Sequence, residues 1–369
     1  MTLPDKKPPF KKDYHEFLVV LGLALLSAGL IKLPEFFGIS PNENEGFYIQ
    51  NFSLFVFPPL VLYFTWKRRI DLHNMLWPGL AFLVALLFIN LYPFKPGGDT
   101  EVLAALHLPI ALWLVVGVAF TGCNWSQLEK RMEFIRFSGE LFIHFVLIGL
   151  GGMILTGFMA LIFQTIEIDI EPFFESWILP CGIAGSVIIA SWLVEIKMGI
   201  SDNLAPLLSK LFTPLFAIVL ITFLGTLLYT GRPLDMERDA LIAFDMLLVL
   251  VLGLLIYSVS ARKPESSPGV FDMIQVVLLA SALIADLIAL FSISGRITDL
   301  GFTPNRLVAL GLNLILLVNL AVSALLYIQF LMKRSAFSQL EKWQTAYLPV
   351  FAFWAAVVVI VIPLLFGFS

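Results

Sequence analysis

The sequence predicts an all-α, polytopic bundle of about eleven transmembrane helices, with the N-terminus in the cytoplasm and the C-terminus outside. Three observations predict this fold class. Hydrophobic residues make up 59% of the chain and charged residues only 14%, with a mean hydropathy of +0.92. Apolar runs of about 20 residues recur, which is the length a helix needs to cross a bilayer. The runs are continuous and do not alternate, so they indicate helices and not barrel strands.

Short polar segments separate the apolar runs and so place the spans. No connecting segment exceeds about twenty residues, so we expect a single integral membrane domain over 1–369, with a basic cytoplasmic segment at 1–16. The hydrophilic stretch at 260–269 is the one candidate boundary, and we interpret it as a loop. The expected spans are 17–37, 51–66, 75–94, 102–122, 141–164, 177–196, 206–229, 239–260, 270–293, 305–331 and 346–367.

The first span has basic residues before its apolar stretch, as a signal peptide does. The sequence that follows is Lys32-Leu33-Pro34 and not the small residues of a cleavage site, so we expect a retained helix.

Small residues in spans five and six predict close helix packing. Gly182, Ser186 and Ala190 recur at four-residue spacing in span six. Gly149 and Gly152 lie in span five. Because small side chains let backbones approach, we expect neighbouring helices to come close at these positions.

The distribution of Lys and Arg predicts the orientation of the spans. If the N-terminus is inside, six of the 23 Lys and Arg residues fall on the outer side and the other seventeen on the cytoplasmic side. Cytoplasmic loops carry such an excess. Connecting segments rich in Lys and Arg alternate along the chain with segments that are poor in them. A missed or divided span would break this alternation, so the bias supports an odd number of spans, with ten or twelve as the alternatives. The six outer residues are Lys32, Lys95, Arg232, Arg238, Arg296 and Arg306.

Two cytoplasmic segments share the pentapeptide Ser-Gln-Leu-Glu-Lys, at 126–130 and at 338–342. Each contains the S-x-x-E pattern of a capping box, in which the Ser side chain caps a helix and the Glu reaches back. Flanking apolar residues, Trp125 in one segment and Trp343 in the other, predict two short amphipathic helices lying in the membrane interface.

Several classes of function lack their signatures. A net charge of −4 gives no basic surface for nucleic acid, and Cys123 and Cys181 are too few for a disulfide framework or a metal cluster. Nucleophile elbows, zinc-protease motifs and phosphate loops are absent, so the sequence favours no enzyme and calls for no cofactor. Glu140 and His144 share a helix face but supply at most two metal ligands, so we interpret them as a hydrogen-bonded helix-end pair.

Polar residues inside the outer half of spans eight to ten form the principal candidate site. Asp245, Asp286 and Asn313 lie about 9 to 12 Å from the outer ends of their spans, at a rise of 1.5 Å per residue. Sequential spans usually pack as neighbours, so we expect the three side chains in one layer. An ionisable residue within the membrane marks a functional hypothesis. The alternative is that the aspartates are structural ties.

A segment with two arginines connects the last two of these spans. The sequence predicts a loop from Arg296 to Arg306, with Thr303 as the N-cap and Pro304 as the first residue of the next helix. The positive end of that helix and the two guanidinium groups would together bind a phosphate or carboxylate. Alternatively, both arginines extend to lipid headgroups.

The same segment carries a resemblance. The run Arg296-Ile-Thr-Asp-Leu-Gly-Phe-Thr-Pro-Asn-Arg306, with His107-Leu108-Pro109 and a basic stretch ending Glu133-Phe-Ile-Arg-Phe137, resembles the bacterial membrane-protein family called "domain of unknown function 4153". Leu300 stands where family members usually have Tyr. The resemblance implies a bacterial cytoplasmic membrane and no particular activity.

These observations favour a permease-like protein that binds or transports a small anion or a lipid headgroup. Arg296 and Arg306 would hold the anion, while Asp245 and Asp286 exchange a proton beside Asn313. The alternative is a non-transporting accessory or scaffold protein whose polar layer fixes helix packing. A third hypothesis, an intramembrane enzyme acting on a lipid-linked substrate, lacks a nucleophile with a base. The expected partners are membrane lipids and the anionic ligand, and not nucleic acid.

Overall fold

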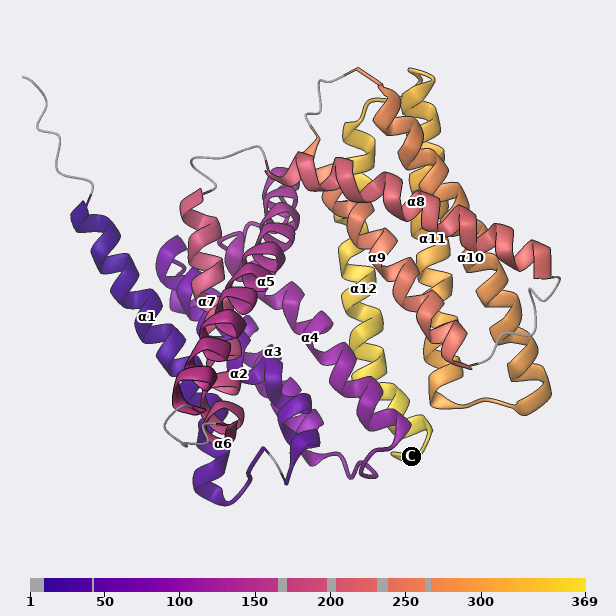
Figure 1. Cartoon of the computed structure of the whole chain (residues 1–369). Coiled ribbons are helices and arrows are strands. Elements are labelled where there is room, and N and C mark those ends of the chain that lie inside the picture. Colours follow the sequence, from indigo (N-terminus) through magenta and orange to yellow (C-terminus); the bar gives the residue numbers. More distant parts are fainter. Residues whose placement is uncertain (1–9, 42, 165–170, 198–203, 231–237, 263–266) are drawn as a thin grey trace, which may run out of the picture.

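The structure of the protein is a computed structural model, and it describes residues 10–41, 43–164, 171–197, 204–230, 238–262 and 267–369 (Figure 1). All the regular elements within these ranges are helices. The elements are α1 (Phe10–Lys32), η1 (Leu33–Phe37), α2 (Glu45–Arg68), α3 (Leu72–Leu91), α4 (Asp99–Phe120), α5 (Leu128–Gln164), α6 (Glu171–Phe173), η2 (Phe174–Ile178), α7 (Leu179–Lys197), α8 (Leu204–Thr230), α9 (Arg238–Ala261), α10 (Val270–Leu300), α11 (Pro304–Leu331) and α12 (Ser338–Leu365).

Each of the eleven expected spans falls mainly on one long helix, while span 17–37 also includes η1 and span 177–196 includes the end of η2. The all-helical fold class is therefore confirmed for the described residues. Nine helices in this part of the chain are long and apolar enough to cross a bilayer. In the other two, α8 and α9, the described apolar segments are shorter, at Phe212–Gly225 and Asp245–Ala261. The architecture therefore fits a multi-pass membrane protein, while the count of eleven stays a prediction.

The helices form two groups that meet along α4 and α12. Helices α1, α2, α4, α5 and α7 surround one core, which includes Tyr63, Phe64 and Phe137. Helices α8 to α12 surround a second core, which includes Leu255, Leu278 and Leu316. In Figure 1, α12 lies beside α4 between the groups, and α8 crosses the second group obliquely. The second core also contains residues of α5, so the groups share apolar contacts.

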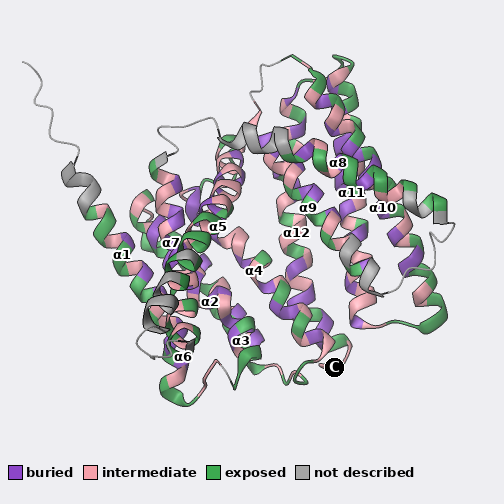
Figure 2. Ribbon diagram, viewed as in Figure 1, coloured by how far each residue is buried: buried purple, intermediate pink, exposed green. Residues whose placement is uncertain are grey.

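The distribution of polar and apolar side chains differs from that in a soluble protein. Large apolar residues on outward faces are exposed, such as Leu72, Trp77 and Phe291 (Figure 2). Fully buried positions include the polar residues Asn319 and Gln344. Because lipid tails solvate apolar side chains but not amides, this distribution fits helices packed within a bilayer.

Glycines permit close helix contact, but not those expected from the sequence. At Gly149 and Gly152 an added Cβ would have no neighbouring atom within 4 Å, and Gly182 is likewise open, so the expectation of close approach at these three residues is wrong. A Cβ on Gly311 of α11 would instead lie 2.1 Å from the Trp354 ring of α12. Whether a glycine permits close packing depends on the side chain that lies opposite it on another helix. The spacing of glycines in the sequence does not identify that side chain.

The two interfacial segments belong to long helices. The first continues into α5 and the second into α12, so the expectation of separate short helices is wrong. Phe337 is the N-cap of α12 and forms no side-chain cap bond, which excludes a capping box at Ser338. Phe337 packs instead against Phe330, with ring centroids 5.3 Å apart. An apolar contact, and not a hydroxyl cap, therefore fixes the start of this helix.

Candidate functional site

The segment from Arg296 to Arg306 is mostly helix and not loop. Helix α10 continues to Leu300, so Arg296 lies in its last turns, and the expectation that Arg296 lies in a loop is wrong. Only residues 301–303 connect α10 to α11. Gly301 has a φ of +78°, which glycine adopts without steric cost, and this lets the chain reverse within three residues.

The start of α11 agrees with the sequence analysis. The hydroxyl of Thr303 accepts a hydrogen bond from the backbone N–H of Arg306 at 3.4 Å, and Pro304 is the first helical residue. The N-cap prediction is therefore confirmed.

Arg306 joins the two helix ends. Its Nη1 donates hydrogen bonds to the carbonyl oxygens of Leu300 at 3.1 Å and Gly301 at 2.8 Å. The last carbonyls of a helix have no partner within the helix, so the guanidinium caps α10. Its Nη2 and Nε atoms make no hydrogen bond to the described residues.

The three polar residues of the predicted layer lie on three adjacent helices. Asp245 is on α9, Asp286 on α10 and Asn313 on α11, and the last two are fully buried. Asn313 Nδ2 donates to Asp245 Oδ1 at 2.8 Å and to the carbonyl of Ala309 at 2.9 Å. The charge of Asp245 also acts on Asp286. Tertiary structure thus joins Asp245 and Asn313 directly, with Asp286 within electrostatic reach.

Asp286 is the member of this layer without hydrogen bonds. Neither of its carboxylate oxygens has a partner among the described residues, and neither does Asn313 Oδ1. The Asn313 amide cannot rotate to relieve this, because its nitrogen faces two acceptors and the exchange would place oxygen against oxygen. Three buried acceptor atoms therefore lack a donor. Such burial costs several kcal/mol, about 1–3 per group, unless a proton or a small cation is present.

A second polar cluster, which the sequence analysis did not identify, joins α1, α2 and α7. Glu195, whose side chain is 5% exposed, contacts Arg68 at 2.8 Å and Lys67 at 3.4 Å. Lys67 also contacts Glu16 at 2.5 Å, and Tyr63 donates to Glu16 at 3.0 Å. In the sequence, Lys67 and Arg68 contribute only to the cytoplasmic excess of basic residues, and nothing pairs them with Glu16 or Glu195. Each charge has an opposite partner, so the cluster acts as a structural tie.

A third cluster links α9 and α10. Arg262 Nη2 lies 3.2 Å from the Asp272 carboxylate, and the guanidinium stacks on Phe330 and Phe337, each 4.7 Å away. The sequence predicts a loop at 260–269 and carries no signal for this pair. The ion pair is nearly buried and holds the helix ends together.

The histidines bond locally. His144 Nδ1 donates to the backbone carbonyl of Glu140, so the expected i,i+4 pair is made through the main chain. His107 Nδ1 donates in the same way to Leu103. Within the described ranges, His, Cys, Asp and Glu form no group of three that would hold a metal ion.

No protein-family model, curated protein or solved structure matches the chain. The resemblance carried by Arg296 to Arg306 is therefore still a prediction, and the functional argument depends on the site itself.

Proposed function

We propose that the chain is a permease-like protein of a bacterial cytoplasmic membrane that couples proton movement to transport of a small anion or lipid headgroup. The observation that carries the proposal is the buried carboxyl of Asp286, whose two oxygens have no hydrogen-bond partner in the described part of the chain. A carboxyl with only a structural role gains no stability from being buried without a hydrogen-bond donor. A carboxyl that alternately holds and releases a proton needs oxygens that no fixed donor occupies.

Asp245 and Asn313 give the proton site its asymmetry. Two carboxylates close together in a low dielectric cannot both ionise readily. Asn313 donates to Asp245 and so stabilises the charge there. The proton is then held at Asp286, which has no donor of its own.

Arg296 and Arg306 would bind the transported anion. Arg306 lies in the first turn of α11, and its Nη2 and Nε form no hydrogen bond to the described residues. The positive end of the α11 dipole also favours an anion at this place. Arg296 lies about one turn before the end of α10. An anion bound between them would weaken the cap on α10, and this couples the anion site to the helix that carries Asp286.

The test uses reconstituted liposomes with an internal pH dye and an imposed pH gradient. We expect proton flux in the wild type that rises on addition of external phosphate or acetate. Asp286→Asn should abolish flux, and Arg306→Gln should remove the response to the anion. Asp299→Asn, an exposed acidic residue on the same helix, is the matched control. Equal flux in Asp286→Asn and wild type would reject the proposal.

The accessory-protein alternative also has an observation in its favour. The guanidinium of Arg306 and the amide of Asn313 both form hydrogen bonds that tie helices together. If the layer serves only packing, the wild-type protein will show no flux with any anion. In that case Asp286→Asn will change thermal stability and nothing else.

A further inference from the structure

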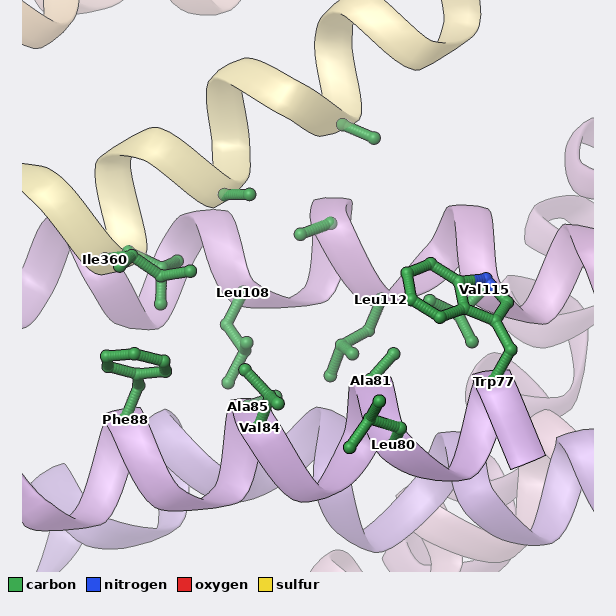
Figure 3. Close-up of a pocket in the computed structure, with 14 residues that line it drawn as sticks. Trp77, Leu80, Ala81, Val84, Ala85, Phe88, Leu108, Leu112, Val115 and Ile360 are labelled. Atoms are coloured by element: carbon green, nitrogen blue, oxygen red, sulfur yellow. The ribbon is translucent and has the colours of Figure 1, made fainter.

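An apolar cavity of about 280 Å³ lies between α3, α4 and α12, away from the polar layer (Figure 3). Helix α4 supplies its floor, with Leu108, Leu112 and Val115. On α3 the lining residues run from Trp77 to Phe88, eleven positions apart, which is about 16 Å along a helix. The cavity is therefore long and narrow, within helices that are apolar enough to span the membrane.

Small side chains create this hollow. Ala81 and Ala85 lie one turn apart on α3, and Ala352 and Ala356 lie one turn apart on α12. Larger residues at these four positions would fill the space between the two helices. Among the lining side chains, only Trp77 carries a polar atom, its indole N–H. A polar metabolite would lose its hydrogen bonds here, so the cavity suits a hydrocarbon chain.

One end of the cavity lies between Phe88 and Ile360. Phe88 and Ile360 lie together at this end in Figure 3. Just beyond, the Tyr92 hydroxyl donates to the carbonyl of Ile360 at 3.1 Å and so ties the end of α3 to α12. The Tyr92 ring also packs on Phe368, with centroids 5.2 Å apart. These two contacts lie next to the Phe88 end of the cavity.

The other end is open and basic. No hydrogen bond within the described residues joins the first turns of α3 to α12. His73 lies one turn before Trp77 on the same face of α3, and Arg69 ends α2 just before it. Both are exposed. Asp71 is also at this mouth, but as the N-cap it makes no side-chain cap bond, so the first N–H groups of α3 are not capped by it.

We propose that this cavity binds one acyl chain of a phospholipid, with the lipid phosphate at the mouth beside Arg69, His73 and the N-terminus of α3. The acyl chain would lie along the apolar side chains of α3, α4 and α12, with its methyl end toward Phe88. The positive helix end and the basic side chains hold the phosphate. Bulk lipid tails are as apolar as the cavity, so retention depends on packing and on these phosphate contacts. This site is independent of the proposed transport function.

The experiment uses the purified full chain in liposomes that contain phosphatidylglycerol with a diazirine in its acyl chain. After illumination, peptide mass spectrometry locates the adducts. We expect them on the lining residues of α3 and α12. Ala356→Leu should lower this adduct about three- to tenfold by displacing a few packed methylenes. Ala280→Leu, an exposed alanine on α10, should leave the adduct unchanged. If Ala356→Leu fails to fold, Ala81→Leu makes the same test.

The phosphate contact has its own measurement. The double variant Arg69→Gln, His73→Gln should lower the adduct of the phospholipid probe but not that of a diazirine diacylglycerol. Adducts spread evenly over all exposed faces, or equal yields in Ala356→Leu and Ala280→Leu, would overturn the proposal. A dimer in native mass spectrometry that Ala356→Leu dissolves would also overturn it, because a helix of a second copy would then fill the cavity.

Discussion

At the scale of single residues, Asp286 differs from the other buried charged groups. Asp272 contacts Arg262, and Glu195 contacts two basic side chains. These pairs offset the cost of removing charge from water. Asp286 is buried to the same degree without such a partner among the described residues. The molecule therefore loses stability at this position, which is typical of groups kept for function.

Removing the carboxyl should stabilise the protein. Asp286→Leu has a similar shape and leaves no buried acceptor, so we expect the free energy of unfolding to rise by about 1–3 kcal/mol. Thermal denaturation in detergent measures this as a higher Tm. Asp299→Leu on the exposed part of α10 is the control for a general gain from leucine. A lower Tm in Asp286→Leu would show that the carboxyl has a structural partner.

Removing the carboxyl of Asp272 should instead destabilise the protein. Asp272→Leu leaves the Arg262 guanidinium without its carboxylate between Phe330 and Phe337. Breaking a buried pair by removing one partner costs about 3–5 kcal/mol. We therefore expect a clear fall in Tm, partly recovered in the double variant Arg262→Met, Asp272→Leu. If the double variant is no more stable than the single, the pair does not explain the loss.

At the scale of elements, contacts between helices depend on a few glycines. Gly311 of α11 lies directly under the Trp354 ring of α12, and Gly139 of α5 lies under Tyr257 of α9. In both cases an aromatic ring occupies the volume that a Cβ would need. One aromatic ring on one glycine therefore contributes to the α11–α12 contact and to the α5–α9 contact.

Gly311→Ala should destabilise the protein by about 1–3 kcal/mol, because the Trp354 ring must move from a well-packed position. Gly253→Ala on α9, where the added Cβ meets nothing within 4 Å, should instead be neutral or gain up to about 1 kcal/mol from helix propensity. Thermal denaturation of both variants measures the difference. Trp354→Leu in the Gly311→Ala background should recover the loss, and failure to recover it would contradict this contact.

At the scale of the whole molecule, two helix groups meet along α4 and α12, and the proposed proton site lies in the second group. The apolar cavity lies at the junction, since α12 lines it together with α3 and α4 (Figure 3). The lining residues of the cavity lie on α3, α4 and α12, whereas Asp245 and Asn313 lie on α9 and α11, so the two sites share no residue. Lipid binding and transport are accordingly separable by mutation.

Topology can be measured with single cysteines. In a background with Cys123→Ser and Cys181→Ser, we expect Ser40→Cys to react with an impermeant maleimide in intact cells. Ser335→Cys should react only after permeabilisation, because cytoplasmic loops carry the excess of Lys and Arg. Leu234→Cys, between α8 and α9, distinguishes eleven spans from nine. Reaction in intact cells supports eleven, and reaction only after permeabilisation contradicts that count.

The sequence by itself determined the class of the molecule. Length and continuity of apolar runs depend on bilayer thickness and on backbone hydrogen bonding, which are local constraints, so each expected span coincides with a helix. The Thr303-Pro304 start of α11 was predictable for the same reason, because an N-cap involves only neighbouring residues. The polar residues of the candidate layer were also visible, since charge inside an apolar run is rare.

Only the tertiary structure decided which of these groups have partners. Arg306 caps α10, Asn313 binds Asp245, and Asp286 has no hydrogen bond among the described residues. Tertiary structure also places the Trp354 ring on Gly311 and joins Tyr92 of the α3 end to the Ile360 carbonyl of α12. These contacts join residues on different helices, and their formation depends on helix rotation and tilt. Apolar periodicity leaves both undetermined in a membrane, because lipid accepts any apolar face.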